Sequence, residues 1–176
     1  MKPTLIIFLM ASAVLARAQT GEMRTTPSCG PGQFNFEVQT NKGSHQLGQA
    51  EAGKALVYFL QDDSELVGES GHTNRLGVDG RWVGATHGDS YFYFSLDPGE
   101  HHLCASWQKG ALPGLANHVA EAHFKAEAGG VYFFKAKNFR FTDRRATSGI
   151  SLGPVDGDEG KLMVSKYSFS TFQHKK

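Results

Sequence analysis

The sequence predicts an all-β protein, an antiparallel β-sandwich or open barrel of about seven to nine strands with room for a short C-terminal helix. Apolar and polar residues alternate with a period of two along several short segments, which is typical of strands with one buried face. Turn-forming residues separate these segments at short intervals, and a helical pattern occurs only near the end of the chain.

The composition is that of a folded domain. Hydrophobic residues make up 40% and aromatic residues 11% of the 176 residues, whereas disordered chains are polar and poor in aromatic residues. A chain of this length buries roughly two thirds of the surface that its unfolded form exposes. A single domain can therefore fold without a metal ion or a dense set of disulfides.

The first 18 residues predict a signal peptide. Met1 and Lys2 precede an apolar run over residues 5–15, and Ala16 and Ala18 supply the small residues of a cleavage site. The run is shorter than the roughly 20 residues that span a bilayer. We expect the mature chain to begin near Gln19, to contain no transmembrane segment and to be periplasmic or secreted.

The remaining chain is divided into an extended leader over residues 19–32 and a single β-sandwich domain over residues 33–176. Cys29 is not preceded by the small apolar residues that lipid attachment requires, so a lipoprotein is not expected. Without residues 1–18 the chain keeps 16 of its 18 basic residues against 17 acidic ones, a formal charge of −1. This balance attracts nucleic acid weakly, and a basic stretch over residues 135–145 is explained by an exposed strand and loop. Its expected counter-charges are Asp156, Asp158 and Glu159.

Turn signals divide residues 73–107 into four strands. Asp79-Gly80 is a two-residue turn that tolerates positive φ, and residues 86–89 and 97–100 supply two more turns. If each turn closes a hairpin, the register pairs Val78 with Arg81, Ala85 with Ser90 and Leu96 with His101. One set of side chains then faces the core: Leu76, Val78, Val83, Phe92, Phe94, Leu96, Leu103, Ala105 and Trp107. The opposite face carries Trp82, Tyr91, Tyr93, His102 and Cys104.

Further strands are predicted over residues 34–38, 55–60, 118–126 and 131–141, and a short helix over residues 156–167. Residues 55–60 are apolar on both faces, as in a central strand. Residues 51–53 and 127–129 are both Glu-Ala-Gly, and each precedes an aromatic strand, which two strands led by similar turns are enough to explain.

Four motifs, EAGKALVY over residues 51–58, VDGRWVG over 78–84, GDSYFYF over 88–94 and PGEHHL over 98–103, give the chain a family resemblance. Together they resemble the bacterial family of domain of unknown function 2846. The resemblance implies a small secreted or envelope protein, with a fold expectation and no catalytic residues to carry over. Many members look like lipoproteins, a pattern from which this chain departs. The chain is also similar, more weakly, to the β-sandwich modules of Pro-Glu-Gly-Ala type.

Cys29 and Cys104 are the only cysteines. Two thiols in an exported chain tend to pair, so we expect a disulfide between them, the alternative being two separate thiols. Because the predicted register places Cys104 beside Tyr93, the bridge would lay the leader across Trp82 and its neighbours.

Two candidate sites follow from the outer face. Trp82, Tyr91 and Tyr93 could form an aromatic platform for a glycan or a protein, unless the leader or a second sheet covers them. His102 and Cys104 share a face, and His123 could add a third metal ligand. His101 and His102 point to opposite faces and cannot hold one ion together. Scattered surface histidines explain this set equally, since no Cys-x-x-Cys or His-Glu-x-x-His spacing is present.

No catalytic or cofactor-binding motif is present, neither Gly-x-Ser-x-Gly nor a phosphate-binding glycine loop. The sequence therefore favours a non-catalytic exported module that binds a protein or glycan partner in the bacterial envelope and needs no cofactor. The alternative is a metal-binding or hydrolytic secreted protein that uses His102, His123 and neighbouring residues. A third reading is a purely structural accessory domain.

Overall fold

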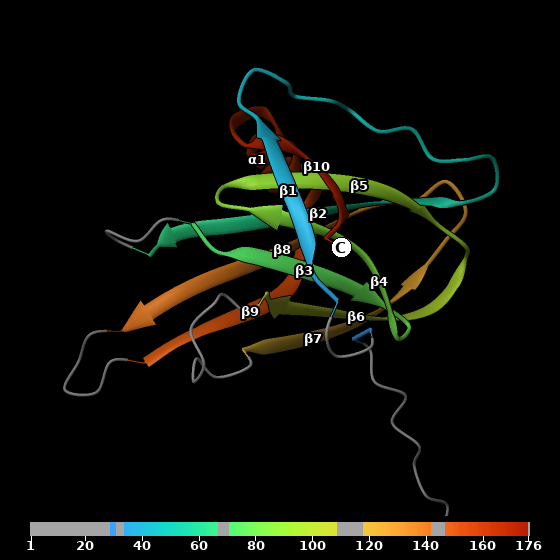
Figure 1. Ribbon diagram of the computed structural model, residues 1–176. Helices are drawn as coiled ribbons and strands as arrows, with labels where there is room; N and C mark the ends of the chain where they lie inside the picture. The colour runs from blue at the N-terminus through green and yellow to red at the C-terminus, as the bar shows by residue number, and fades with distance from the viewer. Residues whose placement is uncertain (1–28, 31–33, 67–70, 109–117, 142–146, 176) are drawn as a thin grey trace, which may run out of the picture.

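Two β-sheets and one helix form the architecture of the chain in the computed structural model, which describes residues 29–30, 34–66, 71–108, 118–141 and 147–175 (Figure 1). A six-stranded sheet has the order β1-β10-β5-β2-β8-β9, and a four-stranded sheet has the order β4-β3-β6-β7. The prediction of a β-sandwich with a short C-terminal helix is confirmed, with ten strands in the described residues. The strands are β1 (Phe36–Asn41), β2 (Ala55–Glu65), β3 (Thr73–Val78), β4 (Arg81–His87), β5 (Ser90–Leu96), β6 (Gly99–Trp107), β7 (Val119–Ala126), β8 (Val131–Phe141), β9 (Thr147–Val155) and β10 (Ser168–His174).

The core lies between the two sheets and contains the side chains that the alternating pattern placed inside. Six of the nine predicted residues are buried in it, and Val83, Phe94 and Leu96 pack against it while partly buried. The face assignment is correct because alternation along a strand is a local property of the extended backbone. The assignment of side chains to a face therefore does not depend on which strand lies alongside.

The predicted pairing of the four strands is wrong in two of its three hairpins. The turn at Asp79-Gly80, with φ values of 49° and 79°, closes the β3–β4 hairpin and pairs Val78 with Arg81 as expected. The next two turns instead carry the chain into the six-stranded sheet and back, so Ala85 does not pair with Ser90, nor Leu96 with His101.

The chain crosses between sheets because β5 carries large rings on both of its faces. Phe92 and Phe94 point into the core, whereas Tyr91 and Tyr93 point to the opposite side. A position between β10 and β2 allows the six-stranded sheet to bury both sets.

The two Glu-Ala-Gly segments form equivalent turns side by side. The amide of Lys54 donates to the carbonyl of Glu51 at 3.0 Å, and the amide of Gly130 donates to that of Glu127 at 2.9 Å. Gly53 and Gly129 have φ values of 78° and 76°, as type II turns require. These turns start β2 and β8 level with each other, and the two strands pair in parallel at the centre of the sheet. The sequence echo thus sets the register of a parallel pair.

The helix α1 (Gly157–Lys166) covers the outer face of the six-stranded sheet. Asp156 caps its N-terminus by accepting hydrogen bonds from the amides of Asp158 and Glu159, each at 2.9 Å. Met163 and Val164 are buried against a second apolar cluster that contains Tyr58 and Tyr91. In Figure 1 the connection from β1 to β2, drawn in cyan, runs along the same side as α1. The six-stranded sheet is therefore covered on both faces.

Gly160 is the contact point between α1 and the sheet. A Cβ atom there would overlap the ring of Phe133 and lie 2.8 Å from its Cβ, whereas one on Gly157 would meet nothing within 4 Å. We expect Gly160→Ala to lower the free energy of unfolding by about 1–3 kcal/mol, because the overlap outweighs the better helix propensity of alanine. Gly157→Ala is the matched control and should be neutral or slightly stabilising in urea denaturation. Equal effects of the two substitutions would contradict this packing.

Candidate functional site

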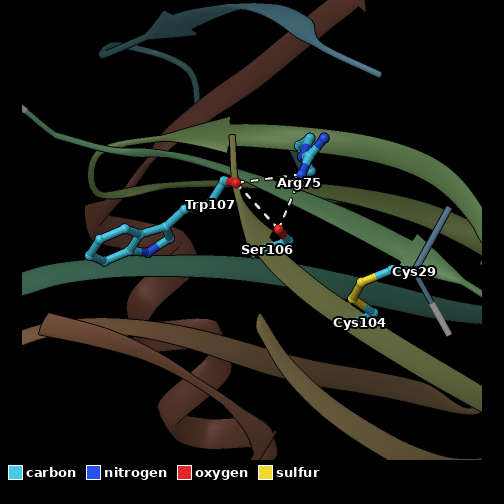
Figure 2. Close-up of a disulfide and its surroundings, with 5 residues drawn as sticks. All are labelled: Cys29, Arg75, Cys104, Ser106 and Trp107. Carbon is cyan, nitrogen blue, oxygen red and sulfur yellow. Dashed lines mark hydrogen bonds between the residues drawn. A yellow bond between two sulfur atoms is a disulfide. The ribbon is translucent and has the colours of Figure 1, made fainter. Parts of the chain in front are cut away.

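The outer face of the four-stranded sheet carries the predicted disulfide. Cys29 and Cys104 are bridged, with their Cα atoms 5.0 Å apart and a sequence separation of 75. Cys104 is fully buried on β6, between Gly77 of β3 and Glu121 of β7. The bridge thus fixes the leader to the middle of this sheet, as Figure 2 shows at Cys29.

Arg75 attaches the segment just after the leader to this face. Its guanidinium donates to the carbonyl of Phe34 at 2.8 Å. It also donates to the hydroxyl of Ser106 at 3.1 Å and to the carbonyl of Trp107 at 3.4 Å, as Figure 2 shows. The side chain is buried, its Nε has no hydrogen-bond partner among the described residues, and burial lowers its pKa. A planar donor group that reaches three acceptors at once is a role that lysine could not fill.

Trp82 lies beneath the leader. The guanidinium carbon of Arg75 is 4.3 Å from the centre of its ring, a cation–π contact. Gly30 approaches it so closely that a Cβ atom on Gly30 would lie 2.6 Å from Cγ of Trp82. The expectation that the bridge lays the leader across Trp82 agrees with this arrangement.

Tyr91 and Tyr93 lie on the other sheet, so the prediction that they share a face with Trp82 and Cys104 is wrong. The hydroxyl of Tyr91 donates to the carbonyl of Gln46 at 2.9 Å, and burial raises the pKa of this fully buried residue to about 12. Gly48 packs on the ring of Tyr93. The three rings therefore do not form one aromatic platform, and each is covered by another part of the chain.

His102 and His123 are brought together as the sequence suggested. They are directly opposite each other on β6 and β7, with ring centroids 6.3 Å apart, and both are exposed. Cys104 cannot join them as a thiolate ligand because it is in the disulfide. Across the described part of the chain, no group of three or more His, Cys, Asp or Glu side chains is placed to hold a metal ion.

A buried polar layer at one end of the sandwich was not predicted. Asn138 accepts a hydrogen bond from Nε1 of Trp107 at 2.6 Å, donates to Asp63 at 2.6 Å, and exchanges bonds with Asn74 at 3.2 and 3.3 Å. Gln61 continues the network by donating to Asp63 and accepting from Thr86 at 2.7 Å. These contacts join the two sheets through satisfied polar groups, which fixes the alignment of the strands. The sequence contained a signal for this layer in the alternation along β8, where every second residue, Phe134, Ala136 and then Asn138, is buried.

The expected counter-charges of the basic stretch are present in part. Lys135 forms an ion pair with Glu159 at 2.5 Å, and Lys137 forms one with Glu65 at 2.7 Å. Arg144 and Arg145 lie outside the described residues, as do residues 1–18, for which a signal peptide is predicted, and most of the predicted leader.

Asp79 links the β3–β4 hairpin to β6 through an ion pair that depends on pH. Its carboxylate accepts from the amide of His102 at 2.9 Å and contacts Nδ1 of His101 at 2.6 Å. Burial alone would raise the pKa of Asp79, but these two bonds outweigh it and lower the pKa. Burial alone would lower the pKa of His101, but the bonds to Asp79 and to the carbonyl of Asp97 raise it.

We expect the stabilisation from this pair to be largest between about pH 4 and 6.5, the ordinary ranges of the two groups. The aspartate contribution is lost as the pH falls through its lowered pKa, and the histidine contribution is lost as the pH rises through its raised pKa. Urea midpoints of the wild type and His101→Gln should differ most near pH 5.5 and less at pH 8.5. A difference in urea midpoint that increases from pH 5.5 to pH 8.5 would contradict the predicted pH dependence.

The structure therefore defines the class of protein as a disulfide-linked β-sandwich whose N-terminal leader is fastened across one sheet. Residues 51–149 match the family described as "Protein of unknown function (DUF2846)", and the chain belongs to this family. Comparisons with curated proteins and with solved structures gave no match. The match includes Cys104 and the His102–His123 pair, whereas Cys29, β1, α1 and β10 lie outside it. Among the described residues, no helix is long and apolar enough to cross a membrane.

Proposed function

We propose that this chain is a non-catalytic exported module that binds a protein partner in the bacterial envelope. The observation that carries the proposal is an open polar surface on a rigid sheet, which we call the β6–β7 strip. It consists of Glu100, His102, Glu121, His123 and Lys125.

The strip is the exposed part of the outer sheet face. Glu100 lies opposite Lys125 and His102 lies opposite His123, so these side chains project from one face, and all of them are exposed, as is Glu121. The next outward positions of β6, Cys104 and Ser106, are buried. Within the described residues, the outer face of β6 thus changes from buried at Cys104 to exposed at His102.

The scaffold beneath the strip is rigid. Leu103 and Ala105, which alternate with the outward positions of β6, are fully buried in the core. The other sheet is covered on both faces, by the core and by α1. A mixed-charge surface held on paired strands suits protein recognition, where charge complementarity gives specificity.

A protein partner is favoured over a glycan because open aromatic rings are lacking in the part of the chain with defined burial. Every Phe, Trp and Tyr of that part is buried or half-buried. Sugar rings commonly stack on exposed aromatic side chains. The export part of the proposal is supported by the bridged cysteines, since disulfides persist in oxidising compartments, and by the signal-peptide pattern of residues 1–18.

The test is a capture experiment from envelope extract with two variants of equal charge change. His123→Glu combined with Lys125→Glu alters the strip, and Lys161→Glu combined with Ser165→Glu alters exposed positions on α1. We expect one protein to be retained by the wild type and the α1 variant and to be depleted at least about tenfold on the strip variant, a loss that corresponds to about 1.4 kcal/mol.

Three results would count against the proposal. The wild type could enrich no protein over beads alone, or the strip variant could retain the same protein as the wild type. Capture that survives protease treatment of the extract and is lost after glycosidase treatment would instead identify a glycan.

A further inference from the structure

The eight histidines of the chain fall into two groups. Six of them contact other parts of the described structure through hydrogen bonds, ion pairs or ring stacking: His45, His72, His87, His101, His118 and His174. The rings of His102 and His123 contact each other, and neither has a hydrogen bond to the described residues. The two rings without such a contact are therefore the two that face each other.

The backbone explains why these rings lie close together. The amide of His102 donates to Oδ1 of Asp79, and its carbonyl accepts from the amide of Asp79, both at 2.9 Å. Both backbone groups of His102 therefore point toward β3 and away from β7. His102 and His123 thus form a non-hydrogen-bonded antiparallel pair, the type in which opposite side chains approach most closely.

The separation of the rings places both imidazoles within reach of one metal ion. Zinc binds an imidazole nitrogen at about 2.0 Å, so two rings at the tetrahedral angle around one ion have centroids roughly 5 Å apart. The observed separation is 6.3 Å, with 36° between the ring planes, and rotation about the side-chain bonds of the two exposed residues brings the rings closer when an ion binds. Both side chains are exposed, so an ion can reach them without any opening of the fold.

The surroundings favour a cation. Glu100 is the next outward residue to His102 along β6, and Glu121 is the next outward residue to His123 along β7. Lys125 lies opposite Glu100. Imidazole ligands suit Zn²⁺, Ni²⁺ and Cu²⁺ more than Mg²⁺ or Ca²⁺, which prefer oxygen ligands.

We propose that His102 and His123 form a two-histidine site for a divalent transition-metal ion of the zinc and nickel type, with water in the remaining coordination positions. The site clamps β6 to β7 and stabilises the folded state when it is occupied. It does not depend on the proposed partner, because both ligands come from this chain.

The test uses purified protein without a polyhistidine tag, with Zn²⁺ and Ni²⁺ alone as probes. Calorimetric titration should show one ion per chain, with at least about tenfold weaker affinity in His102→Gln and in His123→Gln. His87→Gln is the matched control, because His87 is an exposed histidine on another strand, and its affinity should equal that of the wild type. Saturating Zn²⁺ should raise the Tm of the wild type and of His87→Gln but not that of the two site variants.

A second readout separates the site from general surface binding. Sub-stoichiometric Ni²⁺ should broaden the side-chain NMR signals of His102 and His123 before those of the other six histidines. The proposal is overturned if the wild type binds neither ion, or if the two site variants bind as the wild type does. Broadening that spreads evenly over all eight histidines would overturn it as well.

Discussion

Replacing Cys29 and Cys104 together by alanine is expected to lower the free energy of unfolding by about 4 kcal/mol and the Tm by roughly 10 °C. The bridge closes a loop with a sequence separation of 75, so its removal frees a long segment of the unfolded chain. The folded state also loses the covalent attachment of the leader, which leaves the contact of Gly30 with Trp82 and, just after the leader, the bond between Arg75 and Phe34. Guanidinium denaturation of oxidised protein measures the change.

Reduction supplies the control for this prediction. Dithiothreitol should lower the stability of the wild type toward that of the double alanine variant and should leave the variant itself unchanged. If the variant unfolds at the same denaturant concentration as the oxidised wild type, the leader is not a stabilising part of the domain.

Asn138→Leu is expected to cost about 3–5 kcal/mol, although leucine is close in size and apolar. Asn138 supplies partners to Nε1 of Trp107, to the carboxylate of Asp63 and to the amide of Asn74. Leucine would leave Nε1 of Trp107 and the amide of Asn74 without these partners at a buried position, whereas Asp63 keeps its bonds from Gln61 and from the amide of His72. Each orphaned group costs about 1–3 kcal/mol. Chemical denaturation at pH 7 measures the loss.

A double-mutant cycle isolates one bond of this network. Trp107→Phe removes the Nε1 donor, and its cost should be smaller in the Asn138→Leu background than in the wild type, by about 1–2 kcal/mol. Additive effects of the two substitutions would contradict a direct bond between Trp107 and Asn138.

Much of the fold could be predicted from local patterns. Alternation along Phe92, Phe94 and Leu96 identified core side chains because a strand sends successive side chains to opposite faces. The positive φ values tolerated by Asp79-Gly80 identified a true hairpin. Asp156, followed by acidic residues and then lysines, predicted the helix that forms.

The pairing of strands could not be predicted in the same way. Tolerance of positive φ indicates a turn but does not say which strands it joins, because Gly88 and Gly99 also have positive φ in the turns after β4 and β5, which carry the chain between sheets. The difference depends on Tyr91 and Tyr93, which need cover from α1 and from the connection at Gln46 and Gly48, far away in the sequence. Contacts of that kind are set by tertiary packing and not by propensity.

The candidate site was predicted in its parts but not in its layout. The disulfide was predicted from the number of cysteines, and His123 was named only as a possible third ligand beside His102 and Cys104, because its position opposite His102 depends on the pairing of β6 with β7. The position of Trp82 under the leader was expected only as a consequence of the disulfide. Arg75 was not recognised, because a single basic residue in a strand usually faces solvent. A buried arginine with no carboxylate partner requires a covering segment, which only the structure reveals.

The most direct test of the proposed partner surface beside the fastened leader is site-specific photocrosslinking in the cells that make the protein. A photoreactive amino acid is placed at His123 in the β6–β7 strip or, in a separate strain, at Leu162, an exposed residue of α1. We predict a discrete crosslinked protein adduct from position 123 and none from position 162. An adduct from position 162 alone, or none from either, would contradict the assignment of the strip as the binding surface.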